Sequence, residues 1–235
     1  MYLTGISLVT IGFTLSRNAT GTALLTTIAS RFRPGNMFRL VLAGIATLVI
    51  VAILFLSIPY FRERTFRYGR IPQSWEEFVL TFDSSGRFDT LWPATFESAL
   101  NSPIVGNGVG TAERAVAAAL VTRSIDEYAP HNEYLQHWHD FGIIGVIPLI
   151  WFYIVTIRRL WKRWSKYDSE GNRELSYWAM AGFLSVLLVA LTSITANTFH
   201  YPFILSMAFM NIGISDALTE RLDPPRKRAF VVREM

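Results

Sequence analysis

Residues 40–58 have the sequence LVLAGIATLVIVAILFLSI, an uncharged apolar run that decides the fold. The run matches the roughly 20 residues that an α-helix needs to cross about 30 Å of hydrocarbon. In the whole chain of 235 residues, 51% are hydrophobic and 17% are charged, and the apolar residues are gathered in blocks. This composition excludes an ordinary soluble domain and predicts a protein of membrane-spanning helices.

Further apolar runs predict more spans. Three of them follow, at 141–157, 175–196 and 201–215. The segment 2–30 is also apolar, but Arg17 interrupts it, so it forms either one long tilted helix or two shorter pieces. We favour two pieces, because Thr20-Gly21 offers a break. The expected fold class is all-α: a polytopic membrane helix bundle with one long, partly helical loop.

The basic residues predict which ends of these spans are cytoplasmic. All three lysines, Lys162, Lys166 and Lys227, lie in short connections or in the tail, together with many of the arginines. The positive-inside bias places those segments in the cytoplasm and the long loop on the outer side. The expected organisation has four regions: N-terminal membrane segments at 1–59, the outer loop at 60–130, C-terminal membrane helices at 131–217 and a cytoplasmic tail at 218–235.

The net charge and the N-terminal residues indicate the expected partners and the expected processing of the chain. The net charge of +4 comes from cationic residues beside the spans and not from one soluble face, so membrane lipids are the expected partners and nucleic acid is not. No basic residue precedes the first apolar run, so we expect no cleavable signal peptide. The abrupt start suggests that earlier helices are missing.

Arg17 is the first candidate for a functional residue. A charged side chain at membrane depth is costly, so a function is the default hypothesis. If Arg31 marks the cytoplasmic surface, helical geometry puts Arg17 about 21 Å above it, in the outer half of the bilayer. The alternative, which the sequence weighs equally, is a topological anchor whose guanidinium reaches the headgroups.

The outer loop contains a second candidate, Arg87. The segment 60–130 has seven arginines and no lysine, set against nine acidic residues. Most of these arginines are expected to balance surface acids, but a planar guanidinium can also bind phosphate through two hydrogen bonds. Gly106, Gly108 and Gly110 follow at a spacing that permits a tight turn or a close approach to a ligand. A flexible loop is the alternative, and the glycines do not form a dinucleotide fingerprint.

His131 is the third candidate and precedes the span 141–157. On one continuous helix it shares a face with Tyr134, Trp138, Gly142 and Gly145. The two glycines would permit close packing against another helix. His131 could accept a proton at neutral pH, or it could be an ordinary surface residue. His137 and His139 fall on other faces, so we expect no shared metal site on this helix.

In order and spacing, these residues resemble the signature of the bacterial O-antigen ligase and polymerase family. His131-Asn132 is followed by Gly142 and Gly145, and Ser16-Arg17 lies at an earlier membrane segment. The loop between them adds Ser85-Gly86-Arg87, Trp92 and the three glycines. The resemblance covers roughly residues 10–150. Since relatives usually have more spans, the chain is similar to their C-terminal half.

The resemblance implies metal-independent transfer, without a cofactor, of a glycan from an undecaprenyl-pyrophosphate carrier to an acceptor hydroxyl. This would take place on the periplasmic side of the bacterial inner membrane. The resemblance also implies that Arg17 and Arg87 bind the pyrophosphate and that His131 is the general base. The implied acceptor is a growing glycan in a polymerase, and the lipid A core or a protein in a ligase.

Weaker candidates for substrate binding are Asn132, Arg114, Arg123, Gly106 and Gly108. No motif selects the two arginines, and Asn132 could orient His131 or a sugar, or could only cap the helix. Two rival hypotheses stay open. One is a non-catalytic membrane protein that binds polyprenyl phosphate, and the other is a fragment of a longer enzyme with an incomplete pocket.

Overall fold

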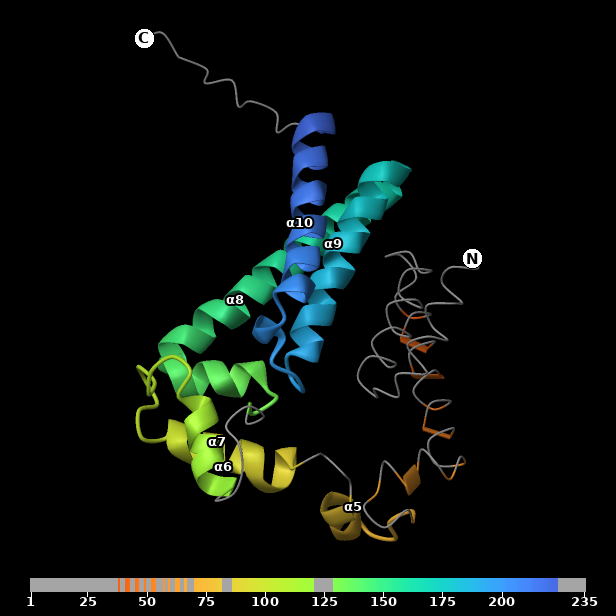
Figure 1. Cartoon of the computed structure of the whole chain (residues 1–235). Helices are drawn as coiled ribbons and strands as arrows, with labels where there is room; N and C mark the ends of the chain where they lie inside the picture. The colour runs from red at the N-terminus through yellow and green to blue at the C-terminus, as the bar shows by residue number, and fades with distance from the viewer. Residues whose placement is uncertain are drawn as a thin grey trace, which may run out of the picture.

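The computed structural model describes residues 70–81, 86–120 and 129–223, together with scattered positions between 38 and 66 (Figure 1). Arg17 and the rest of the segment 2–30 lie outside the described residues, as do Arg123 and about half of the run 40–58. The described positions of that run are helical. Every element assigned in the described part of the chain is a helix, which confirms the all-α prediction there.

The elements pass in chain order from short helices to long ones. The short helices are α5 (Trp75–Thr81), the π-helix η2 (Arg87–Leu91), α6 (Trp92–Ala99) and α7 (Ala112–Leu120). The long helices are α8 (Glu133–Ser169), α9 (Arg173–Thr192) and α10 (Pro202–Leu222), with the short 3-10 helix η4 (Thr198–His200) between the last two.

The three long helices are apolar and long enough to cross a membrane, as the sequence predicted. Their bounds differ from the predicted spans 141–157, 175–196 and 201–215. α8 includes the basic segment after the predicted span and ends at Ser169. α9 ends at Thr192, and the Ser193 side chain closes the helix by donating to the Val189 carbonyl at 2.8 Å. α10 extends to Leu222.

The long helices pack around a shared apolar core. Leu160 of α8, Ala179 of α9 and Ile212 of α10 belong to it. Gly182 lets α9 come close to α8, since a Cβ there would lie only 3.3 Å from the Leu160 side chain. Large apolar side chains also cover the outside of the bundle: Ile147, Trp151 and Phe203. A bundle that is apolar both inside and outside is suited to a lipid environment.

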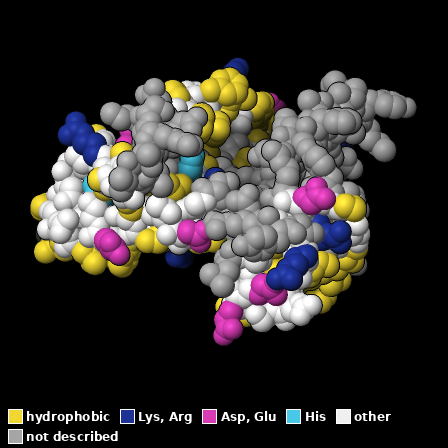
Figure 2. Space-filling model, turned by 60° about the horizontal axis from the view of Figure 1, so that its bottom comes forward, with side chains coloured by type: hydrophobic (Ala, Val, Ile, Leu, Met, Phe, Trp, Pro, Cys, Tyr) yellow, Lys and Arg dark blue, Asp and Glu magenta, His cyan; other side chains and the backbone are white. Residues whose placement is uncertain are grey.

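Basic residues gather at one end of the bundle, which we call the basic end. Arg159 of α8 forms an ion pair with Asp216 of α10 at 3.1 Å, and Arg163 binds the same carboxylate. Lys166 pairs with Asp223. The short helices α6 and α7 lie at the opposite end, here called the loop end (Figure 1). Seen from this end, the described residues present apolar side chains together with scattered charged ones (Figure 2). The structure therefore separates the basic residues of α8 from the loop helices, while the side of the membrane that each end faces stays a prediction.

α8 is broken at Gly142, where the backbone has φ 64° and ψ −168°. The first segment, 133–141, runs across the loop end, and the rest of the helix turns into the bundle (Figure 1). The prediction of one continuous helical face from His131 to Gly145 is therefore wrong, because the helix axis changes direction between them.

Candidate active site

The break in α8 is held by a junction with the loop before α7. We call residues 103–108 and 139–144 together the kink junction. Its four backbone hydrogen bonds run from Ile143 N to Pro103 O (3.0 Å), Ile144 N to Ile104 O (3.3 Å), Asn107 N to His139 O (2.8 Å) and Gly108 N to Asp140 O (3.1 Å). A helix break leaves donors and acceptors without partners inside the helix, and here one loop supplies partners for both kinds.

Gly106 and Gly142 permit this junction because neither position has room for a side chain. A Cβ on Gly106 would lie 2.3 Å from the Asp140 carbonyl oxygen, and one on Gly142 would lie 2.1 Å from the Ile104 carbonyl oxygen. The prediction that Gly142 packs against another helix is wrong, because its partner is the loop. Gly106 and Gly108 serve the backbone of the junction, and a contact between them and substrate stays a prediction.

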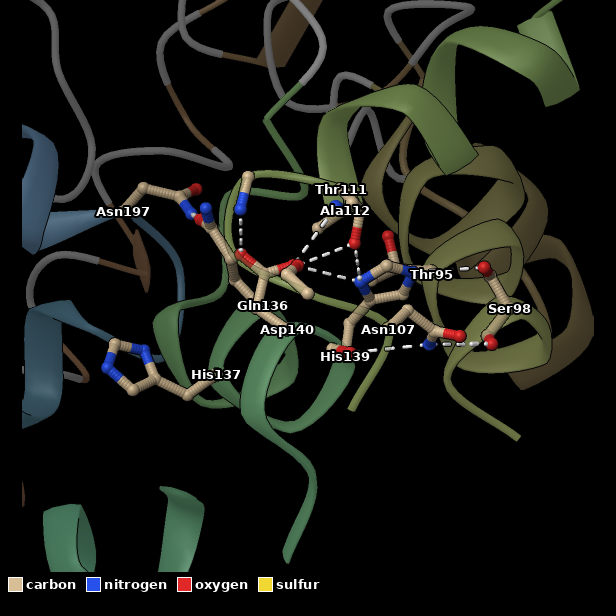
Figure 3. Close-up of polar contacts among 12 residues, drawn as sticks. Thr95, Ser98, Asn107, Thr111, Ala112, Gln136, His137, His139, Asp140 and Asn197 are labelled. Atoms are coloured by element: carbon tan, nitrogen blue, oxygen red, sulfur yellow. Dashed lines mark hydrogen bonds and ion pairs between the residues drawn. The ribbon is translucent and has the colours of Figure 1, made fainter. Parts of the chain in front are cut away.

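A buried polar network lies beside the junction (Figure 3). His139 and Asp140 are only 1% and 4% exposed. The Asp140 carboxylate accepts hydrogen bonds from Gly110 N at 2.8 Å and Ala112 N at 3.0 Å, and one of its oxygens lies 2.9 Å from His139 Nδ1. His139 Nε2 lies 2.9 Å from Ser98 Oγ. This order of groups is similar to a hydrolase triad, but the buried histidine offers no access to a substrate. Its role is to fasten α6 and α7 to α8.

A second polar cluster holds the connection between α9 and α10 against the first segment of α8. The buried carboxylate of Glu133 accepts a hydrogen bond from Phe199 N at 2.9 Å and lies 3.1 Å from His137 Nδ1. The Gln136 side chain accepts another from the Asn197 amide. These contacts bring η4 to the loop end, although it follows α8 by a whole helix.

His131 lies where the loop enters α8, two residues before Glu133 of the second cluster. Its φ of +53° is uncommon for a residue with a side chain and marks a constrained backbone. Before it, the Pro130 carbonyl accepts a hydrogen bond from Trp92 Nε1 at 2.9 Å. After it, the Asn132 side chain caps α8 by accepting from Leu135 N at 3.0 Å. Contacts from both sides therefore fix the position of His131.

The surroundings of His131 lower its pKa from the ordinary value of 6.5. Burial is the largest cause, followed by the positive charge of Arg87 and then by His200. A lowered pKa keeps the imidazole neutral at neutral pH and able to accept a proton. The structure thus brings together Arg87 from η2, His131 ahead of α8 and His200 from η4.

Arg87 begins the π-helix η2, directly after Gly86, whose φ is +79°. Thr90 N and Leu91 N both donate to the Gly86 carbonyl at 2.9 Å. Leu91 is buried against Val116 of α7, which anchors the short helix. Single-turn π-helices often occur at functional sites, and this one holds Arg87 within electrostatic range of His131.

His200 and Glu113 are two residues of this region that the sequence analysis missed. His200 Nε2 lies 3.3 Å from Glu113 Oε1, so η4 contacts α7 beside His131. Neither residue belongs to a motif. Only the topology could have indicated His200. The predicted spans 175–196 and 201–215 place the connection at 197–200 on the same side of the membrane as the loop 60–130.

The remaining predicted residues have separate positions. Asn132 performs the capping role that the sequence left open. Arg114 is exposed on α7, one position after Glu113. Arg17 and Arg123 lie outside the described residues. Of the three principal candidates, the structure therefore places two, Arg87 and His131, in one neighbourhood.

Comparison with known proteins gave one finding. Residues 2–150 match the family model described as O-Antigen ligase. Neither the curated proteins nor the solved structures gave a significant match. The matched segment contains Arg87, His131 and the kink at Gly142, and it ends within α8, before His200.

Proposed function

Since the chain belongs to the O-antigen ligase family of membrane glycosyltransferases, we propose that it transfers a glycan from undecaprenyl pyrophosphate to an acceptor hydroxyl. In this proposal the loop end faces the periplasm and the basic end faces the cytoplasm of a bacterial inner membrane. The region 60–130 is then the periplasmic loop, between membrane segments at 1–59 and 131–217, and 218–235 is the cytoplasmic tail. The donor lipid reaches the site from the outer leaflet.

The observation that carries the proposal is that Arg87 lies close enough to His131 for its charge to lower the pKa of the imidazole. The two residues belong to separate motifs of the family resemblance, and they come from different helices. A cation and a neutral imidazole are the groups that this reaction needs, one for the diphosphate and one for the hydroxyl proton.

The proposed reaction moves one proton and exchanges one bond. His131 accepts the proton of the acceptor hydroxyl, whose oxygen forms a bond to the anomeric carbon of the donor glycan. The bond between that carbon and the pyrophosphate oxygen breaks, and the pyrophosphate keeps the electron pair. Arg87, with Arg17 as a second cation, stabilises the charge that develops on the leaving group. No metal or cofactor takes part in these steps.

A ligase and a polymerase of this family differ in the acceptor that receives the glycan. A ligase would deliver the glycan to the lipid A core or to a protein, and a polymerase would deliver it to a growing glycan. A non-catalytic protein that only binds polyprenyl phosphate is the third alternative. The lowered pKa of His131 favours catalysis over this alternative, because simple binding of a diphosphate would be better served by a charged imidazolium.

A transfer assay in a strain that lacks its own enzyme tests the proposal. The full chain is compared with its His131→Ala, Arg87→Ala and Arg17→Ala variants. Loss of a general base or of a charge-stabilising group typically slows a reaction by about 10²-fold or more. Arg70→Ala is the control, because Arg70 is exposed and pairs with Glu77 at 2.6 Å. Undiminished transfer by all three variants would falsify the proposal.

The products separate the alternatives within the class. If deletion of the gene abolishes the ladder of lengthened glycans, the protein is a polymerase. If full-length glycans accumulate without being attached, the protein is a ligase. Binding of polyprenyl phosphate without turnover, together with indifference to His131→Ala, would identify the non-catalytic alternative.

A further inference from the structure

The loop that closes the kink junction presents an uncharged, apolar surface. Ile104, Val105 and Val109 are 61%, 66% and 76% exposed. No charged residue occurs between Glu97 and Glu113. A cluster of large exposed apolar side chains on an uncharged loop marks a surface that another apolar phase covers. We call residues 103–109 the apolar tip.

The apolar tip is continuous with the outer surface of the bundle. Ile143 and Ile144 begin the second segment of α8 and are 49% and 59% exposed, as is usual for residues that face lipid. Their backbone N–H groups donate to the carbonyls of Pro103 and Ile104 at 3.0 and 3.3 Å. The tip therefore lies beside the start of the second segment of α8, at the same level along the bundle.

Several backbone polar groups of the tip have partners within the protein. In hydrocarbon, irregular backbone is stable only where its polar groups have partners within the protein. The carbonyls of Pro103 and Ile104 and the N–H groups of Asn107 and Gly108 take part in the kink junction, and Gly106 N donates to Ser102 O at 2.8 Å. Trp138 Nε1 adds a hydrogen bond to the Pro103 carbonyl at 3.1 Å. Tryptophan side chains in such positions are typical of a membrane interface.

We propose that the apolar tip inserts into the lipid bilayer at the loop end and anchors the short helices to the membrane surface. Lipid is the occupant that the continuity with α8 favours, since the tip and the span share one surface. The insertion fixes the height of His131 and Arg87 above the hydrocarbon. A lipid-linked diphosphate lies at that height, because its headgroup stays at the interface while its chain is in the membrane.

Single spin labels on the full chain test this proposal directly. The sequence contains no cysteine, so each introduced cysteine is the single labelling site. Val105→Cys probes the tip, Ile147→Cys on the exposed face of α8 is the lipid reference, and Ala118→Cys on the exposed face of α7 is the water reference. The protein is reconstituted in vesicles of phosphatidylethanolamine and phosphatidylglycerol. Collisions of each label with oxygen and with a water-soluble nickel chelate are then measured.

The expected result is that the label at 105 collides more often with oxygen than with nickel, as the label at 147 does and the label at 118 does not. Equal access of nickel to 105 and 118 would overturn the proposal. Shielding of the label at 105 from both reagents would also overturn it, because protein and not lipid would then cover the tip. Ile104→Cys provides a second tip site if Val105→Cys does not reconstitute. The result does not depend on glycan transfer, so it stands or fails separately from the proposed function.

Discussion

Gly106 and Gly142 each pack against the backbone of the segment that carries the other. The space for a Cβ on Gly106 is filled by the peptide between Asp140 and Phe141, and the space for one on Gly142 is filled by the peptide between Ile104 and Val105. This mutual contact joins the loop to the helix break without any side chain between them. It also determines where α6 and α7 lie relative to His131.

Gly106→Ala is expected to destabilise the protein strongly. The methyl group would meet the Asp140 carbonyl, and alanine would also have to adopt a φ of +80°. Overpacking costs about 1–3 kcal/mol, and a left-handed backbone adds about 1–3 kcal/mol. Thermal unfolding in detergent should show a large fall in the midpoint, accompanied by loss of transfer.

Two control variants separate the causes of that loss. Gly110→Ala keeps the positive φ, but its new Cβ meets no atom of the described residues within 4 Å. Gly213→Ala lies in α10, where the space is equally open among the described residues and the backbone is helical. We expect Gly213→Ala to be the most stable of the three variants, Gly110→Ala to be less stable and Gly106→Ala to be the least stable. If Gly110→Ala is as damaging as Gly106→Ala, then backbone strain, and not the close approach of the Asp140 carbonyl, is the reason why position 106 requires glycine.

Asp140→Asn is expected to loosen the short helices while leaving the charges near His131 in place. The carboxylate accepts from Gly110 N and Ala112 N, and an amide would turn an N–H group toward one of these donors. A buried donor that loses its partner costs about 1–3 kcal/mol. Hydrogen exchange should therefore rise in α7 more than in α9, and the exposed Glu97→Gln serves as the control. Uniform exchange across both helices would contradict the assigned role of Asp140.

The lowered pKa of His131 predicts the pH dependence of transfer. The base is active when neutral, so kcat/KM should fall on the acidic side with a midpoint below 6.5. Arg87→Gln removes a positive charge that disfavours the imidazolium, so the pKa of His131 should rise and the midpoint should move to higher pH. His200→Gln should move it in the same direction by less, because the effect of His200 is smaller.

Rate profiles between about pH 5 and 8, where histidine titrates, check this prediction. Arg70→Gln should leave the midpoint unchanged, since Arg70 pairs with Glu77. A shift to lower pH in Arg87→Gln would show that Arg87 does not act on the titrating group.

The pair of Glu113 and His200 predicts an energetic coupling between α7 and η4. Both side chains are partly exposed, so their interaction when His200 is protonated contributes about 0.2–1 kcal/mol, which is up to about fivefold in a rate constant. Glu113→Gln, His200→Gln and the double variant form a cycle in which the double variant should be no worse than the poorer single one. Strictly multiplicative losses in kcat/KM would show that the two residues act independently.

The spans were predictable because their signal is local. The lengths of the runs at 141–157, 175–196 and 201–215 sufficed to place the three long helices. The family resemblance supplied the association of Arg87 with His131, which no local pattern contains. The short helices of the loop were predicted only as a partly helical segment, since they lack the long apolar pattern that marks the spans.

The kink could not be predicted, because its cause is a tertiary contact. The only proline that α8 contains, Pro148, lies in the second segment, six residues after Gly142, and does not mark the position of the break. The break is stabilised because the carbonyls of Pro103 and Ile104 accept hydrogen bonds from Ile143 N and Ile144 N, which in a continuous helix would donate to carbonyls of α8 itself. His200 escaped prediction for a similar reason, since its partner Glu113 is distant in the chain.

The contact between Glu133 and Phe199 has a practical consequence for protein engineering. The match to the family model ends at residue 150, yet the carboxylate at the start of α8 accepts a hydrogen bond from the N–H group of a residue in η4, beyond α9. A chimera with a crossover at that boundary would combine a donor and an acceptor from different parents. Exchange of residues 86–201 as one block keeps both partners from a single parent, together with Arg87, His131 and His200.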